Sequence, residues 1–214
     1  MSSTSIVAPE MSLIETILSD LTVDITESLF DQLLQEGLLR DIPVVSSLVN
    51  LAKAGVDAAN YLFLRKTIRF LLHLKDVPEE ERRRFVDQLD TDEKLKRRVG
   101  ENLFLLLHRL DDMQKPELLG RIFRAFVVGK IDYVTYQKLS TTVDRIKVYS
   151  IPYLLEFYSD QPTPESSDDE TLQDLAFCGL VNIPKAEGLV FGRSGYAGNE
   201  LGRLFIEIAL NKAA

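Results

Sequence analysis

Residues 116–148 read PELLGRIFRAFVVGKIDYVTYQKLSTTVDRIKV, and this stretch indicates the fold class of the chain. Pro116 is tolerated in the first turn of a helix. The apolar residues after it recur every three or four positions: Leu118, Leu119, Ile122, Phe123 and Phe126. Gly129 ends this helix, and Asp132 can cap a second helix from Tyr133 to about Val148. The stretch therefore predicts two consecutive helices joined by a short turn.

The sequence on both sides of this pair also has helical spacing. Further helices are predicted over residues 11–21, 24–38, 43–74, 78–89, 91–110 and 151–158. Thr91 is the predicted N-cap of the helix that follows it. No strand-like alternation occurs before residue 180, so residues 11–158 are predicted to form a helical bundle. Residues 1–10 are small and polar, which predicts a disordered tail.

The C-terminal quarter has a different composition. Residues 159–170, SDQPTPESSDDE, are predicted to be an acidic linker. Six of the eleven glycines lie between Gly179 and Gly202. The pattern there predicts a helix over 168–177, a turn at 178–179, strands over 180–183 and 188–193, and a helix over 199–212. We therefore expect a mainly α protein, with a helical bundle and a small C-terminal α+β tail over 171–214 that is winged-helix-like.

The order of these parts resembles that of the Abi-alpha-type proteins, which are associated with abortive infection. The resemblance is carried by an apolar helix pair (DITESLFDQLLQEGLLRDIPVV), a basic stretch (LFLRKTIRFL), a helical middle and a compact tail (LAFCGLV and YAGNELGRLFIEI). It covers module order over most of the chain, with few exact motif matches. The chain has no Trp and so lacks the tryptophan-containing central segment of that group. The resemblance implies a role in phage defence.

Composition sets the broad class. The chain has 214 residues, of which 45% are hydrophobic and 27% charged, and its formal net charge is -8. These values favour a folded soluble protein and exclude a fibrous repeat or wholesale disorder. The first ten residues contain no Lys, no Arg and no apolar segment, so no secretory signal is expected and a cytoplasmic location is predicted.

Charge is distributed in four blocks. Residues 1–39 hold seven acidic and no basic side chains, and residues 148–184 likewise hold seven acidic and no basic ones. Residues 40–147 hold 21 basic and 16 acidic side chains, and residues 185–214 hold four and three. The acidic arms can fold back on the mildly basic middle or compete there with an anionic partner, although an uneven solvated surface is the favoured interpretation.

Few residues in the chain can carry chemistry. Cys178 is the only cysteine, and its apolar surroundings, LAFCGLV, predict a buried, inert thiol. His73 and His108 have no carboxylate or second imidazole at a useful spacing. Within residues 127–136 Asp132 is the only carboxylate, which is too few oxygen ligands for calcium. We therefore predict no catalytic residue, no metal site, no cofactor and no enzymatic activity.

The segment 42–64 contains the first candidate for a functional surface. It is amphipathic, with small residues and a Lys53/Asp57 pair on its polar face. The favoured interpretation is a core helix of the bundle, and the alternatives are a membrane-active element or a dimer interface. The candidate partner or membrane surface consists of Leu48, Val49, Ala52, Val56, Phe63, Arg65, Lys66 and Arg69.

A second candidate is a cluster of cations that could contact an anion or a partner. It consists of Arg82, Arg83, Arg84, Lys94, Arg97 and Arg98. Seven carboxylates lie within residues 79–93, so a salt-bridged solvated face is the favoured interpretation. In a DNA-binding winged helix, the helix before the wing would enter the groove of the DNA. Residues 168–177 hold four carboxylates and no Lys or Arg, so their charge would repel the phosphate backbone. Nucleic-acid binding is therefore disfavoured.

The residues favour a non-enzymatic protein-interaction or regulatory protein with a protein partner. A membrane-active effector that uses residues 42–64 is the alternative, and a nucleic-acid binder is the third choice. Homo-oligomerisation is left open, and neither the partner nor the biological trigger follows from the sequence.

Overall fold

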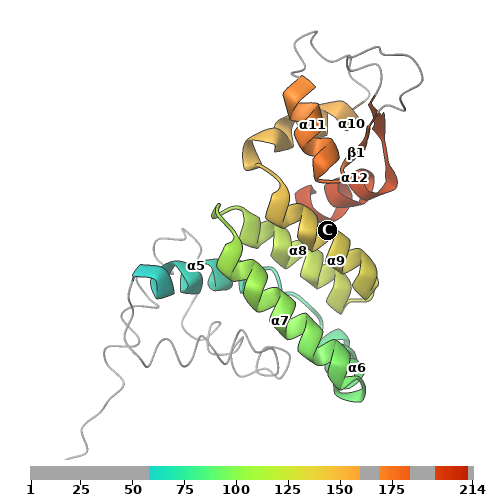
Figure 1. The fold of residues 1–214 in the computed structure, drawn as a ribbon. Coiled ribbons are helices and arrows are strands. Elements are labelled where there is room, and N and C mark those ends of the chain that lie inside the picture. Colours follow the sequence, from blue (N-terminus) through green and yellow to red (C-terminus); the bar gives the residue numbers. More distant parts are fainter. Residues whose placement is uncertain (1–57, 160–168, 184–195, 212–214) are drawn as a thin grey trace, which may run out of the picture. The chain divides into compact units, whose positions relative to one another are not determined.

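The computed structural model describes residues 58–159, 169–183 and 196–211. These residues contain eight α-helices, α5 to α12, together with a 3-10 turn, a π-helical segment and a two-stranded antiparallel sheet (Figure 1). The predicted fold class, mainly α with a small sheet near the C-terminus, is confirmed at this level. The chain divides into two compact units, one up to His108 and one from Arg109 onward.

The first unit contains three helices among its described residues. They are α5 (Ala58–Leu72), α6 (Glu79–Thr91) and α7 (Glu93–Arg109). Helix α5 is the described part of the helix predicted over 43–74, and residues 43–57 lie outside the described residues. Apolar side chains from all three helices are buried, among them Phe70, Phe85 and Leu103, each at most 1% exposed. Phe63 of α5 packs against Phe104 and His108 of α7, so ring contacts join these two helices.

The cap between α6 and α7 differs from the prediction by one residue. Asp92 Oδ1 accepts hydrogen bonds from the backbone N–H groups of Lys94 and Leu95, both at 3.0 Å. Thr91 is instead the last residue of α6, where its hydroxyl donates to the Gln88 carbonyl at 2.8 Å. The prediction that Thr91 caps α7 is wrong. The Thr91 hydroxyl is hydrogen-bonded within α6, whereas one carboxylate oxygen of Asp92 accepts from two N–H groups in the first turn of α7.

The helix pair predicted over 116–148 is confirmed as α8 (Lys115–Val127) and α9 (Tyr133–Arg145). Gly129 has φ 73°, and the N–H of Lys130 donates to the Ala125 carbonyl at 2.8 Å, which is the Schellman arrangement at a helix end. Asp132 caps α9 by accepting a 2.8 Å hydrogen bond from the N–H of Thr135. Helix α9 ends three residues before the predicted position, because Ile146 leaves the helical region at ψ 138°.

The second unit has its core around α8, most of whose residues are buried. On α8 and α9 four aromatic rings pack together, and Phe126 stacks on Tyr136 with ring centroids 5.1 Å apart. The other two rings are Phe123 and Tyr133. Arg121 Nη1 donates to the Ala209 carbonyl at 2.8 Å. This cation donates to a carbonyl in the last turn of η3, where a helix end leaves carbonyls without intrahelical donors.

After α9 the chain forms short elements only. A 3-10 turn, η1 (Val148–Ser150), leads into α10 (Ile151–Tyr158), and α11 (Asp169–Phe177) follows the acidic stretch. Strand β1 (Val181–Asn182) pairs antiparallel with β2 (Ala197–Gly198). The last elements are α12 (Glu200–Phe205) and a π-helical segment, η3 (Ile206–Leu210). The partner of β1 thus lies after the strand predicted over 188–193, which falls outside the described residues.

Tyr158, at the end of α10, links this helix by hydrogen bonds to Leu180 and Asn199 in the C-terminal part of the second unit. Its hydroxyl donates to the Leu180 carbonyl at 2.5 Å and accepts from the N–H of Asn199 at 2.9 Å. Asn199 in turn accepts from the N–H of Gly202 at 2.8 Å and donates to the Gly179 carbonyl at 3.0 Å. A Cβ on Gly202 would overlap both Tyr158 Oη and the Leu180 carbonyl. Helix α10 therefore belongs to the same unit as α11, the strands and α12.

Candidate functional site

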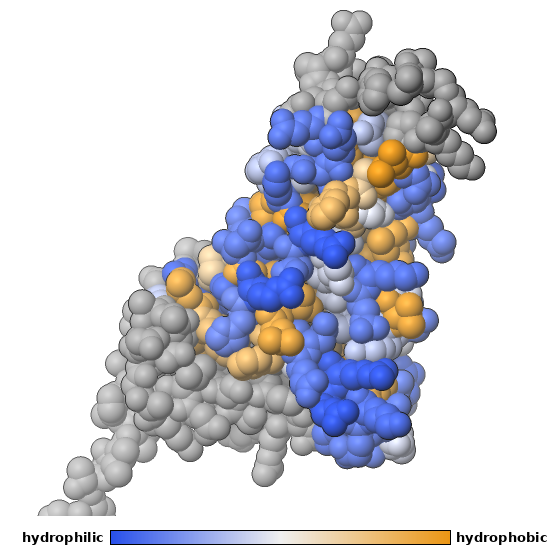
Figure 2. Space-filling model, in the orientation of Figure 1, coloured by the Kyte–Doolittle hydropathy of each residue, from blue (hydrophilic) through white to orange (hydrophobic). Residues whose placement is uncertain are grey.

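The predicted cluster of cations lies on α6 and the first half of α7. Figure 2 shows hydrophilic side chains gathered over α6 and the adjacent end of α7. Arg83 pairs with Glu79, Arg84 pairs with Glu81, and Arg97 Nε lies 3.9 Å from Glu101. The other cluster members are Arg82, which is half-buried, and Lys94 and Arg98, which are exposed.

Carboxylates neutralise much of this surface. Lys96, beside the cluster, pairs with Asp90 at 2.8 Å. The hydrogen bond from Arg83 lowers the pKa of Glu79 below its ordinary value, so this carboxylate keeps its charge and its pairing at neutral pH. The arrangement favours the interpretation of a solvated, salt-bridged face, because phosphate binding needs cations that are not already matched.

Only part of the predicted partner or membrane surface is described. Leu48, Val49, Ala52 and Val56 lie outside the described residues, and the remaining members lie on α5. Phe63 is 2% exposed and stacks on His108 with ring centroids 4.2 Å apart. Its placement on a surface is therefore wrong: the ring packs against α7, because a helical face that looks apolar in sequence is turned toward the neighbouring helix.

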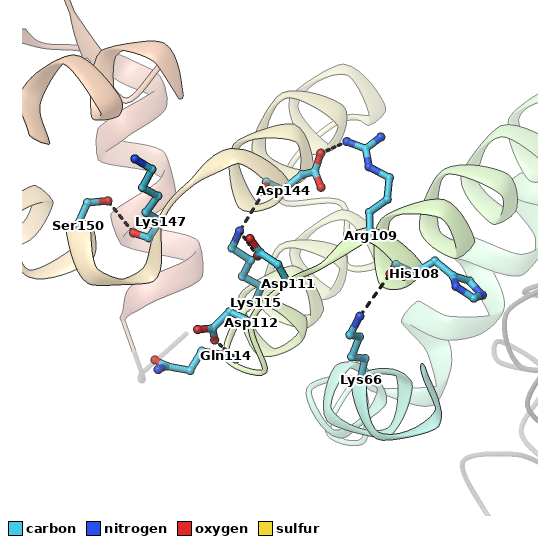
Figure 3. Close-up of polar contacts among 10 residues, drawn as sticks. All are labelled: Lys66, His108, Arg109, Asp111, Asp112, Gln114, Lys115, Asp144, Lys147 and Ser150. Atoms are coloured by element: carbon cyan, nitrogen blue, oxygen red, sulfur yellow. Dashed lines mark hydrogen bonds and ion pairs between the residues drawn. The ribbon is translucent and has the colours of Figure 1, made fainter. Parts of the chain in front are cut away.

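The three cations of that prediction are half-buried on α5. They are Arg65, Lys66 and Arg69. Lys66 Nζ donates to the His108 carbonyl at 3.3 Å, near the C-terminal end of α7 (Figure 3). Arg65 lies over the ring of Tyr61 at 5.8 Å. Lys66 thus contacts α7, and Arg65 contacts a residue of its own helix.

None of the described helices combines the length and the apolar character that a membrane crossing requires.

A buried lysine marks a polar cluster that the sequence did not predict (Figure 3). Lys115, at 3% exposure, donates to the Asp144 carbonyl at 3.1 Å and pairs with Asp111 at 2.7 Å. The Asp144 side chain accepts from Arg109. The cluster joins the start of α8 to the last turn of α9, where a cation stabilises unpaired carbonyls. Because the contacts of Lys115 with Asp144 and Asp111 hold the two helices together here, we interpret the cluster as structural.

The structure describes both Cys178 and His108, which are residue types that can act as a nucleophile or a metal ligand. Cys178 is 8% exposed, and burial, followed by the charge of Asp174, raises the pKa of its thiol. The predicted burial of this thiol is confirmed. His108 is exposed and its ring stacks on Phe63. Within residues 58–159, 169–183 and 196–211 no three His, Cys, Asp or Glu side chains are arranged to hold a metal.

Aromatic side chains are exposed around the end of α9. Phe177 is 75% exposed, and the Arg145 guanidinium lies 5.6 Å from its ring centre. Tyr149 is 61% exposed, and Lys147 Nζ lies 5.7 Å from its ring centre. Lys147 also pairs with Asp174 at 2.7 Å, and this hydrogen bond, followed by that to Tyr149, raises the pKa of Lys147. The charge of Lys147 is thus already matched.

Helix α10 continues this exposed surface. Its inward side is anchored by Leu154, which is fully buried. Residues of η1 and α10 that recur at i, i+3, i+4 and i+7, together with Leu155, form a surface that we call the α10 stripe. The members of the α10 stripe are Tyr149, Pro152, Tyr153, Leu155 and Glu156. Tyr153 is 44% exposed and Leu155 is 42% exposed, and Glu156 is the one charged member of the stripe.

The α10 stripe went unnoticed in the sequence, although a signal was present. The segment IPYLLEFY has one charged residue in eight positions, so apolar side chains occupy both faces of any helix it forms. A short helix at the edge of a unit can bury only one of those faces.

Comparison of the chain with family models, curated proteins and solved structures finds no match.

Proposed function

We propose that the chain is a cytoplasmic, non-enzymatic protein-interaction or regulatory protein that binds a protein partner through the α10 stripe. The single observation that carries the proposal is the exposure of Tyr153 and Leu155 on α10 and of Tyr149 on the 3-10 turn η1 that precedes it. Scattered exposed apolar residues are normal on a protein surface, but a contiguous helical face of them is typical of a binding site.

The chemistry of the stripe supports a protein partner. Tyrosine is enriched at protein interfaces because its ring buries a large apolar area while its hydroxyl tolerates water. The base of the stripe is rigid, because Leu154 is packed inside and Tyr158 is hydrogen-bonded to Leu180 and Asn199. A rigid surface loses little conformational entropy on binding.

The proposal extends to the tail as a winged-helix-like binding module without a nucleic-acid role. The order of α11, β1, β2 and α12 supports this interpretation. Helix α11 contains Asp169, Glu170 and Asp174 and no basic residue, so its charge opposes approach to a phosphate backbone. The membrane-active alternative stays a prediction, since most of residues 42–64 lie outside the described residues.

A role in phage defence is the biological setting that we propose, and it rests on the resemblance in module order alone. We expect expression of the chain in a susceptible bacterial host to lower the plating of phage. The double substitution Tyr153→Ser/Leu155→Ser should remove the protection at equal protein level. Unchanged plating with the wild-type chain would contradict this setting.

Site-specific photo-crosslinking tests the proposed function directly. A benzoylphenylalanine replaces Tyr153 in one version and Arg98 in a matched version, because both positions are exposed. In cells that produce the protein, irradiation should give discrete protein adducts from position 153 and none from position 98. Absence of adducts at position 153, with the protein folded, would contradict the proposal.

A further inference from the structure

We draw no further inference here: the strongest candidate, the exposed surface patch over η1 and α10, belongs to the site already described, and nothing in the structure shows what covers it, because Arg145, Lys147 and Arg203 balance Glu156 and the already paired Asp174 among the described residues around it.

Discussion

The surface over α6 and α7 and the surface over α10 are both exposed, and they differ in what their side chains already contact. On α6 and α7 the charges are dense but matched, as the Arg83/Glu79 and Arg84/Glu81 pairs show. On α10 the charges are few, while Tyr153 and Leu155 face water. The comparison teaches that charge density alone does not mark a binding site. An apolar face left outside the core is the more informative feature.

The largest expected effect concerns the support of the α10 stripe. Gly202→Ala should destabilise the protein by about 3 kcal/mol, because the new Cβ overlaps Tyr158 Oη and the Leu180 carbonyl. Urea-induced unfolding measures the change. Glu200→Ala, an exposed substitution in the same helix, is the control and should cost less than about 0.5 kcal/mol. Equal stability of the two variants would show that the tail is not packed as described.

The next effect removes the Tyr158 hydroxyl and keeps its ring. Tyr158→Phe should cost about 2 kcal/mol, because the Leu180 carbonyl loses its donor and the N–H of Asn199 loses its acceptor. Tyr153→Phe on the same helix is the control, since Tyr153 is 44% exposed. Thermal unfolding of both variants would contradict the role of Tyr158 if their midpoints coincided.

A smaller effect of opposite sign is expected in the aromatic core of the second unit. Tyr136 is fully buried, and its hydroxyl has no hydrogen-bond partner in the part of the chain that the structure describes. Burial accordingly raises the pKa of Tyr136 above its ordinary value. Tyr136→Phe should stabilise the protein by about 1 kcal/mol in urea unfolding. A loss of stability would mean that the hydroxyl has a partner.

The smallest effect sharpens the description of the α6–α7 surface. The pKa of Glu79 is lower in the folded protein than in the unfolded chain. The pairing with Arg83 therefore stabilises the fold above the unfolded-state pKa of Glu79. This stabilisation is lost as the pH falls through the folded-state pKa. Arg83→Gln should remove this small acid-side loss and shift the melting temperature at neutral pH by less than about 2 °C. Melting curves between about pH 7 and about pH 3 test this expectation. A large shift at neutral pH would mean that the pair is more than a surface contact.

Local signals in the sequence were sufficient for much of the fold. The turn between α8 and α9 was predicted from Gly129 and Asp132, because a left-handed glycine and a capping carboxylate act within a few residues of themselves. Helix α10 was predicted with its observed limits, Ile151–Tyr158. The cap at Asp92 was missed by one position, since two adjacent residues are both good caps and only the end of α6 separates them.

Features that depend on distant contacts could not be predicted. The pairing of Val181 with Gly198 joins residues separated by a long connection, and nothing near either strand specifies it. The burial of Phe63 depends on His108 and Phe104 of another helix. The α10 stripe is exposed for the same kind of reason, because the identity of the face that meets the core is decided by the rest of the unit.

Site-specific photo-crosslinking from both surfaces is the most direct measurement of the difference between them. Benzoylphenylalanine in place of Tyr153 should give discrete protein adducts in cells, whereas benzoylphenylalanine in place of Arg98 should give none. Adducts from position 98 with none from position 153 would contradict the assignment of binding to the α10 stripe and would return the charged surface of α6 and α7 to first place.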